Sequence, residues 1–413
     1  MKILIISAAF PPMHAGEASN TYFLAKHLAK RNLDVHVLTS LGNTGGPDPG
    51  ITVHPIMRQW SWLELPRFKT FLKRCSPDAI LLMYIGLMYN FQPMITFAPT
   101  ISKKIFPHTP FVTRYESAFV GADPSQTSLI ARAFRKFVVQ QWAGRRNVTY
   151  RSGTLLRDSD QIIALCKQHR ALLVAEWPHS QSKTTIIPPP PNIRVCPDSA
   201  SEARQRGRAI LGLPPDEFVI AFLGYLYPGK GVEVLLQAFQ KVRHQRSHVR
   251  LLFIGGKIDL NVDGGASHFE TMDKLSKQLG VDDKIIWTGA FKAEDEEASL
   301  FLRAADIGVL PFLQGVQLNN SSFSTMAAHD LPIIATRGPC LDEQFIHGEN
   351  IFLCGPNDAH ALAQSMTLMI DHLELRDRLR SGVQKLSKEW FCWDTAITRT
   401  LATFGTKSRH ALC

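Results

Sequence analysis

The chain has 413 residues, too many for one ordinary hydrophobic core, so we expect two domains. With 45% hydrophobic and 20% charged residues, its composition is that of a folded protein and excludes intrinsic disorder. The net charge of +10 arises in residues 1–200, which hold 23 basic and 11 acidic residues, whereas residues 201–413 hold 23 and 25. A basic first half indicates an anionic partner such as a membrane surface, a phosphorylated lipid or a nucleic acid.

The hydropathy pattern predicts neither a signal peptide nor a membrane span. The start, MKILIISAAFPP, has an apolar run that is too short for a signal peptide and is typical of a first strand. The most apolar later stretch, 79–89, is too short to cross a bilayer. The seven cysteines are scattered without CxxC pairs, which predicts free thiols in a reducing compartment and no zinc site. We therefore expect a cytoplasmic protein.

In the first half, short apolar runs alternate with helical patterns, which predicts a parallel sheet. The helix at 17–31 follows the first strand, and Asn32 is expected to take the left-handed position that ends it. Strands are predicted at 2–7, 35–39, 78–84, 110–113, 161–165 and 184–187.

Two loops of this half lie at the carboxyl ends of strands, where open α/β sheets bind ligands. The first contains His14, Ala15 and Gly16, and we consider it the loop on the acceptor side. His14 has the alternative of an ordinary solvent-exposed loop residue. Tyr115 and Glu116 follow a later strand at the same edge.

The stretch 129–157 combines apolar residues at helical spacing with many arginines. One interpretation is a basic amphipathic helix that contacts an anionic membrane, which would place the protein peripherally at the inner face of the membrane. The other is a core helix whose polar face is basic.

Four consecutive prolines at 188–191 form a stiff link between domains. We expect an N-terminal domain over 1–195 and a C-terminal domain over 205–388. Residues 389–413 are expected to form a last helix and a tail that return toward the N-terminal domain.

The second half repeats the alternation. Strands are predicted at 218–223, 250–254, 285–288, 307–311 and 332–335. Helices are predicted at 232–239 and 295–304, from about 322, over 359–384 as two helices, and at 388–404.

The loop GYLYPGKG, residues 224–231, joins a buried strand to a helix and carries one lysine, Lys230. Backbone N–H groups and the helix dipole favour an anion there, and Lys230 adds a positive charge, so the loop is a candidate phosphate site. It matches neither the Walker sequence nor the GxGxxG turn. The alternative is an ordinary strand-to-helix connection.

Four stretches together resemble family 4 of the retaining glycosyltransferases. They are FPPMHAGEASNTYFLAKHLAKRNLDVHVLTS, GYLYPGKGVEVLLQAF, WTGAFKAEDEEASLFLRAADIGVLPF and MAAHDLPIIAT. The resemblance implies an α/β protein of the GT-B fold, with two Rossmann-like parallel-sheet domains that face each other across a cleft. It also implies transfer of a hexosyl group from a nucleotide-sugar to an acceptor with retention, without an essential metal or other cofactor.

The resemblance also implies which residues form the site. The C-terminal domain would bind the donor, and the basic N-terminal domain would bind a glycan, lipid-linked or other anionic acceptor; no nucleic-acid module is recognised. The implied donor-binding residues are Gly224, Tyr225, Lys230, Gly255, Phe291, Asn319, Asn320, Ser321, Ser322 and Thr325. The candidate catalytic residues are Gln317, Tyr115 and Glu116.

This sequence departs from the family pattern at four of these positions. The two glutamates of the EX7E motif fall on Gln317 and Thr325, which places the chain in a subgroup that lacks them. The arginine of the phosphate loop falls on Tyr225, and the histidine after the third N-terminal strand falls on Tyr115. A neutral Gln317 can hydrogen-bond sugar hydroxyls but cannot offset positive charge in a transition state.

Three functions remain open on these residues. The first is an active retaining glycosyltransferase. The second is a catalytically silent GT-B protein that binds a nucleotide-sugar or a partner as a regulatory or scaffold subunit. The third, a nucleotide-sugar epimerase of similar fold, needs carboxylates that the sequence does not place in the cleft.

Overall fold

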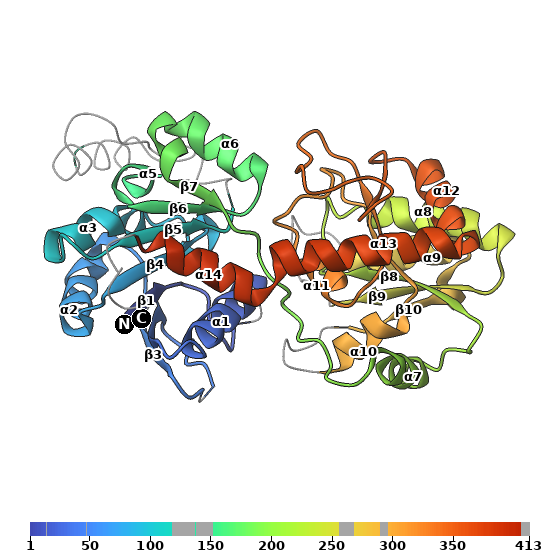
Figure 1. The fold of residues 1–413 in the computed structure, drawn as a ribbon, viewed down its shortest axis with the longest axis horizontal. Coiled ribbons are helices and arrows are strands. Elements are labelled where there is room, and N and C mark those ends of the chain that lie inside the picture. Colours follow the sequence, from blue (N-terminus) through green and yellow to red (C-terminus); the bar gives the residue numbers. More distant parts are fainter. Residues whose placement is uncertain are drawn as a thin grey trace. The chain divides into compact units, whose positions relative to one another are not determined.

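The computed structural model describes residues 1–13, 15–46, 48–117, 137, 152–255, 268–289 and 296–405. The chain folds as two compact units (Figure 1). The first unit comprises Met1–Pro188 with Trp393–Cys413, and the second comprises Pro189–Cys392. Within the described ranges, no helix is long and apolar enough to span a membrane. Most of the basic stretch 129–157 lies outside the described residues.

The first unit contains a parallel sheet of seven strands in the order β3-β2-β1-β4-β5-β6-β7. The strands are β1 (Lys2–Ile6), β2 (Asp34–Ser40), β3 (Ile51–Met57), β4 (Ala79–Tyr84), β5 (Phe111–Tyr115), β6 (Gln161–Ala164) and β7 (Thr184–Ile186). The helices are α1 (Gly16–Ala29), α2 (Leu65–Cys75), α3 (Ala98–Ile105), α5 (Leu155–Asp158), α6 (Lys167–Glu176) and α14 (Trp393–Thr403).

Alternate residues of each strand supply two separate cores, one on each face of this sheet. Leu4 and Ile6 of β1 belong to the core beneath α2, α3 and α6. Ile3 and Ile5 belong to the core beneath α1 and α14. Because both faces are covered, the central strands β1 and β4 are almost entirely apolar, which is why they could be recognised in the sequence.

Helix α14 follows the second unit in the chain but packs in the first unit. The ring of Trp393 stacks on His27 of α1, with centroids 4.5 Å apart, and Arg31 forms an ion pair of 2.9 Å with Asp394. Burial in this contact lowers the pKa of His27 to about 4, so the imidazole is neutral. Ala396 and Ile397 then complete the apolar core on this side of the sheet.

The second unit contains a parallel sheet of six strands in the order β10-β9-β8-β11-β12-β13. The strands are β8 (Phe218–Leu223), β9 (Val249–Ile254), β10 (Ile285–Trp287), β11 (Ile307–Leu310), β12 (Ile333–Thr336) and β13 (Phe352–Cys354). The helices are α7 (Ala200–Ile210), α8 (Val232–Gln245), α9 (His268–Gln278), α10 (Glu296–Ala304), α11 (Ser321–Ala328), α12 (Ala359–Asp371) and α13 (Leu373–Leu386). A π-helical turn, η7 (Ser387–Phe391), follows α13.

The chain enters the second unit at Pro189, a few residues before the expected boundary at 195–205. The reason is that the residues after the prolines already bond to the second unit. The backbone N–H of Asn192 donates to Thr325 Oγ1 over 3.3 Å, and that of Cys196 donates to Ser299 Oγ over 2.8 Å. The division between the units therefore falls within the proline run, and the segment after the prolines belongs to the second unit.

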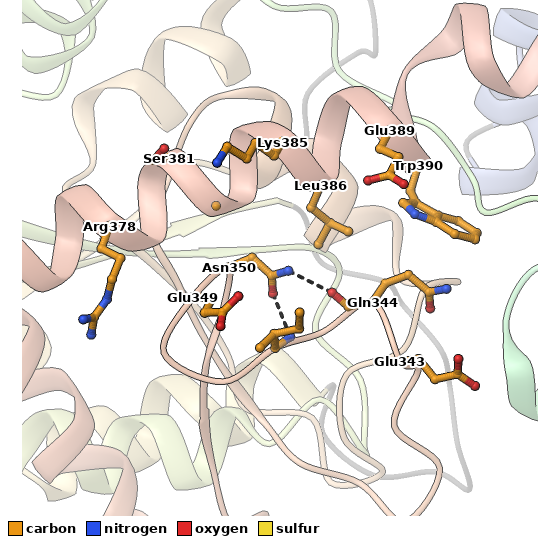
Figure 2. A pocket seen from close by; sticks show the side chains of 12 residues that line it. Glu343, Gln344, Glu349, Asn350, Arg378, Ser381, Lys385, Leu386, Glu389 and Trp390 are labelled. Atoms are coloured by element: carbon orange, nitrogen blue, oxygen red, sulfur yellow. Dashed lines mark hydrogen bonds between the residues drawn. The ribbon is translucent and has the colours of Figure 1, made fainter.

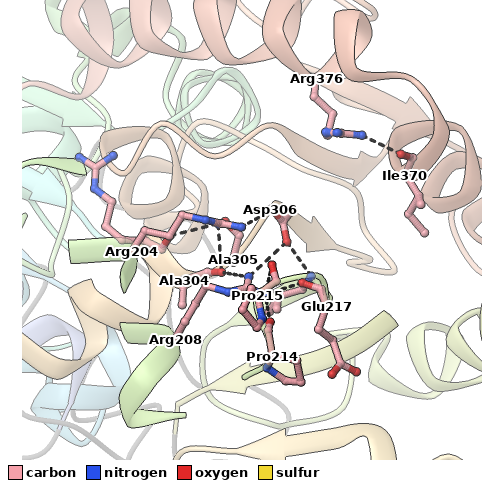
Figure 3. A network of polar contacts seen from close by, with 12 residues as sticks. Arg204, Arg208, Pro214, Pro215, Glu217, Ala304, Ala305, Asp306, Ile370 and Arg376 are labelled. Atoms are coloured by element: carbon pink, nitrogen blue, oxygen red, sulfur yellow. Dashed lines mark hydrogen bonds and ion pairs between the residues drawn. The ribbon is translucent and has the colours of Figure 1, made fainter. Parts of the chain in front are cut away.

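A buried arginine connects α7 to the residues that precede the central strands β8 and β11 (Figure 3). The Nη2 group of Arg208 donates to the carbonyls of Pro214 and Glu217, both over 2.6 Å, while Nη1 donates to Ala304 O over 3.2 Å. Asp306 Oδ2 lies 3.8 Å from Arg208 Nη1. The same oxygen accepts a hydrogen bond of 2.7 Å from the N–H of Val219 in β8. Arg208 thus donates to three backbone carbonyls and connects α7 to the segments before β8 and β11.

We predict that Arg208→Met destabilises the second unit by roughly 2–3 kcal/mol, because it removes charge-assisted hydrogen bonds to buried carbonyls. Urea denaturation followed by circular dichroism should show a lower midpoint. Arg206→Met is the matched control on the same helix, since the Arg206 side chain is 50% exposed and its ion pairs are at the surface. Equal midpoints for the two variants would contradict the structural role of Arg208.

Candidate functional site

Glycines with positive φ follow two strands of the second unit, β8 and β9, and another ends the loop after β8. Gly224 has a φ of +139° and Gly231 a φ of +68°. A Cβ atom on Gly231 would lie 1.9 Å from the carbonyl oxygen of Pro311, and one on Gly255 would lie 2.2 Å from that of Gly224. The ends of β8 and β9 are therefore in direct backbone contact, and the loop 224–231 is held against residues 311–313, which follow β11.

Lys230 extends from this loop into an aromatic environment. Its Nζ lies 4.3 Å from the ring centroid of Phe312 and 4.9 Å from that of Tyr227. Burial lowers the pKa of Lys230 to about 8. The ammonium makes no hydrogen bond or ion pair with any residue that the structure describes. A cation held in place without an acidic partner in the described ranges suits an anionic ligand.

Residues 316–320 form a rigid turn that leads into α11. The N–H of Gln317 donates to Asn320 Oδ1 over 2.7 Å, and that of Leu318 donates to Asp342 Oδ2 over 2.9 Å. The N–H of Asn320 returns a bond of 3.1 Å to Gln317 O. The side-chain oxygen of Asn320 is thus used to shape the turn, while Gln317 is held beside it with 8% of its surface exposed.

The start of α11 lies beside the glycine loop. A Cβ atom on Gly224 would approach Ser322 Oγ to 3.3 Å, which shows how close the two segments are. Asn320 occupies the N-cap position of α11 without a side-chain hydrogen bond to the helix. The N–H groups of Ser321 and Ser322, in the first turn of the helix, have no carbonyl partner within the helix itself and carry its positive dipole end. Together with Lys230, they form an arrangement suited to a diphosphate.

Thr325 does not belong to this arrangement, contrary to the prediction. Its side chain is fully buried, and Oγ1 donates to Asn192 Oδ1 over 2.9 Å and accepts from Asn192 N. Its carbonyl contacts His329 Nδ1 at 2.7 Å. Thr325 lies one turn inside the helix from Ser322 and anchors the segment that enters the second unit.

The other predicted donor residues have a mixed outcome. Gly255 is the glycine whose close approach to Gly224 is described above, and Tyr225 is half-buried in the loop itself. Asn319 lies in the turn before α11. Phe291 lies outside the described residues.

In the first unit, the structure contradicts the placement of Tyr115 at a reactive position. Tyr115 is the last residue of β5 and is fully buried, with its ring 5.5 Å from that of Tyr84. Burial raises the pKa of its phenol well above the usual value. Phe111 and Tyr115 of β5 lie in the core beneath α2 and α3, because alternate strand residues share a face.

Glu116, the next residue, is held by groups that the sequence analysis did not assign. Arg114 Nε donates to Glu116 Oε1 over 2.5 Å, and Asn20 Nδ2 donates to Oε2 over 3.3 Å. Arg114 is almost completely buried, and its Nη2 has no partner in the described part of the chain. Burial, together with the charge of Glu116, raises the pKa of Glu17. Arg114, a charged residue at an inward position of β5, is the feature of the sequence that could have indicated these contacts.

The loop before α1 is described only in part. Ala15 occupies the N-cap position of α1 and Gly16 is its first residue. His14 lies outside the described residues. Glu17 and Asn20, on the first turns of α1, bring this loop next to Glu116 at the carboxyl edge of the sheet. In the ranges that the structure describes, no three His, Cys, Asp or Glu side chains gather to hold a metal ion.

Residues 217–372 match the sequence model of a family described as glycosyl transferases group 1, and this stretch lies wholly within the second unit. Among curated relatives, D-inositol 3-phosphate glycosyltransferase of Corynebacterium efficiens is 26% identical over 265 residues, which are 63% of this chain and 59% of the relative. The enzyme of the same name from Segniliparus rotundus is 29% identical over 260 residues, 61% of this chain and 53% of the relative. The chain thus spans less than two thirds of the length of these relatives.

Solved structures resemble both units. Anabaena HepE in complex with UDP-glucose has a TM-score of 0.68 at 16% identity, covering 98% of this chain and 100% of that one. A glycosyltransferase from Rickettsia africae has a TM-score of 0.71 at 15% identity, covering 98% and 97%. These likenesses show the fold: two Rossmann-like parallel-sheet domains of the GT-B type.

The pKa of Lys230 leads to a pH-dependent prediction for a diphosphate ligand. With a pKa of about 8, Lys230 is charged at neutral pH and loses its charge above pH 8. Affinity for UDP should therefore be constant below that pH and fall by about tenfold per pH unit above it, until the neutral form dominates binding. Isothermal titration calorimetry from pH 6.5 to 9.5 measures this.

Dividing the affinity of the parent by that of Lys230→Met at each pH removes the titration of UDP itself. Lys241→Met, an exposed lysine on α8, serves as the matched control and should behave as the parent. A ratio of parent to Lys230→Met that stays constant across the pH range would show that the ammonium does not contact the ligand.

Proposed function

We propose that the protein is a glycosyltransferase that transfers a hexosyl group from a nucleotide-sugar to an acceptor, with retention and without a metal ion. The observation that carries the proposal is the ammonium of Lys230, which lies at the glycine loop of the unit that also holds the start of α11 and has no acidic partner among the residues that the structure describes. The family match over residues 217–372 and the GT-B fold support it. The solved neighbour that binds UDP-glucose supports a nucleotide-sugar as the donor.

In this mechanism the second unit stabilises the leaving nucleoside diphosphate. Negative charge grows on its phosphate oxygens as the bond to the sugar breaks. Lys230, the N–H groups at the start of α11 and the N–H groups of loop 224–231 are fixed in advance, so no reorganisation is needed when the charge appears. A cation and several N–H donors supply here the stabilisation that a metal ion supplies in other enzymes.

Gln317 is proposed to orient the sugar. Its backbone is fixed through Asn320, its side chain is close to fully buried, and it directly precedes the turn into α11. An amide can donate to one hydroxyl and accept from another. Its neutrality avoids placing a negative charge beside the diphosphate.

The first unit is proposed to bind the acceptor. Glu116, fixed by Arg114 and Asn20, is a carboxylate at the carboxyl edge of the sheet that can accept a hydrogen bond from an acceptor hydroxyl. The positive charge of residues 1–200 favours an anionic or lipid-linked acceptor, and we propose peripheral contact with the inner face of a membrane through residues 129–157. Such contact would keep the protein in the cytoplasm beside its acceptor.

A silent regulatory or scaffold protein is the second candidate. The observation that favours it is the loss of both motif carboxylates: Thr325 is bonded to Asn192 and Gln317 is neutral. Such a protein would bind the nucleotide-sugar through Lys230 without turning it over. Turnover therefore distinguishes the two candidates, whereas nucleotide binding does not.

The test is a panel of nucleotide-sugars with mass detection of the released nucleotide, run with EDTA and with neutral or anionic vesicles as acceptor surface. We expect one donor to be turned over in EDTA, faster with anionic vesicles at low salt, and a product of retained anomeric configuration by NMR. Gln317→Ala should lower turnover about tenfold or more, because it removes a contact to the reacting sugar. Gln317→Glu should not raise it.

Nucleotide binding without turnover of any donor would favour the silent protein. Unchanged rates in both Gln317 variants would remove this residue from the site, and a gain from Gln317→Glu would show that the glutamate mechanism had only been weakened. Turnover that is indifferent to vesicle charge and to salt would remove the membrane from the proposal.

A further inference from the structure

An open recess lies in the second unit, away from the residues that form the candidate donor site (Figure 2). It is an open groove of about 640 Å³ between α13, the π-helical turn η7 and the loop 343–350. None of its lining residues belongs to the loop 224–231 or to the turn before α11. The groove is formed by one unit alone.

The walls of the groove are fixed before any ligand arrives. A Cβ atom on Gly382 would lie 2.1 Å from the carbonyl oxygen of Glu349, so α13 and the loop are in direct backbone contact. The amide of Asn350 closes the loop: Nδ2 donates to Gln344 O over 2.8 Å, and Oδ1 accepts from Ile346 N over 2.9 Å. Both bonds are drawn in Figure 2. Because the groove is already rigid, it loses little conformational entropy when it binds a ligand.

The loop 343–350 and η7, which line the groove, also pack against α11. Phe345 of the loop packs on Phe323 of α11 with centroids 4.8 Å apart, and Phe391 of η7 packs on the same ring at 5.6 Å. Phe323 and Phe391 are fully buried, and Phe345 is nearly so. The groove is therefore part of the rigid body that carries the start of α11.

The lining combines an aromatic ring with charges of both signs. In Figure 2, Arg378 lies at one end of the groove, and Glu389 and Trp390 lie at the other. Arg378 and Lys385 extend from α13, and Glu349 lies across from them. These three charged groups form no hydrogen bond or ion pair within the described ranges, although they line one groove.

A neutral ligand with many hydroxyl groups fits this lining better than an ion does. Each hydroxyl both donates and accepts, so it can bond a carboxylate and a guanidinium at once. An anion would be opposed by Glu343, Glu349 and Glu389, and a cation would be opposed by the two basic residues. A sugar ring also presents an apolar face of C–H groups, which can pack on Trp390.

The π-helical turn is a second, independent observation at the same place. It follows directly on the regular helix α13 and contains both Glu389 and Trp390. π-Helical turns are rare and recur at functional sites, because the wider turn re-aims neighbouring side chains. From Arg378 to Trp390 the helical segment rises roughly 18 Å, the length of a short oligosaccharide.

We infer that this groove is a saccharide-binding site, distinct from the donor site, that holds an uncharged oligosaccharide against Trp390. The site goes beyond the proposed transfer and does not require it. In a protein that extends a glycan, such a site would keep the chain bound between transfers and raise its local concentration.

Saturation-transfer NMR on the full-length protein tests the inference with two neutral probes, maltotetraose and cellotetraose. We expect at least one to bind with a millimolar or tighter dissociation constant. Trp390→Ala should weaken that binding about tenfold or more, and Trp390→Phe should retain much of it. Arg378→Gln should also weaken it.

Arg380→Gln is the matched control, since Arg380 lies on the same helix but does not line the groove and pairs with Asp377. Thermal unfolding and UDP affinity of every variant establish that the fold and the donor site are intact. Absence of binding by both tetrasaccharides, or equal binding by the parent and Trp390→Ala, would overturn the inference. Since UDP binding is measured separately, failure here is distinct from failure of the proposed function.

Discussion

The close approach of three backbone segments at the carboxyl edge of the second sheet is the constraint on which the candidate site depends. Gly231 touches Pro311 and Gly255 touches Gly224, at distances that leave no room for a Cβ atom. These contacts press the end of the loop 224–231 against the residues that follow β11. Phe312 is one of those residues, and it is the ring on which the Lys230 ammonium rests. A substitution at either glycine would therefore move the cation as well as the backbone.

The charge balance of the site follows from the same geometry. An ammonium on an aromatic face is partly compensated by the ring, which helps Lys230 to be half-buried, and burial lowers its pKa to about 8. The family pattern would place glutamates at the positions of Gln317 and Thr325. Here one is an amide and the other is bonded to Asn192, so neither competes with a ligand for the cation. The missing carboxylates and the absence of an acidic partner for Lys230 in the described ranges agree with each other, and under the proposed function the positive charge is available to a diphosphate.

The parallel strands buried on both faces could be predicted from the sequence because they are continuous apolar runs. β3 and β13 were missed. β3 contains Pro55 and lies at the edge of its sheet, where a missing N–H does no harm, and β13 has only three residues, too few to show a pattern. The prediction that Asn32 adopts a left-handed conformation is confirmed by its φ of +58°.

Side chains of the site were harder to predict than strands, because a motif fixes a position in the chain and not the direction of a side chain. Lys230 was predicted from its loop, but the two rings that hold it come from different segments. Tyr115 and Glu116 are adjacent in sequence, yet the pleat of β5 sends one into a core and leaves the other at the edge.

Side chains alternate between the two faces of β5, and this alternation places the charged Arg114 on an apolar face. It shares its face of β5 with Val112, whose neighbours are the apolar residues beneath α1 and α14, so it stands at a position where a charged side chain is costly. The cost is offset by Glu116, and the pair fixes that carboxylate beside Asn20 and Glu17 of α1. A buried ion pair of this kind is weak evidence for stability, since an apolar pair of the same volume would serve the core as well or better. Its presence at the carboxyl edge of the sheet is better explained by the carboxylate that it positions, and on this ground we propose that Glu116 contacts the acceptor.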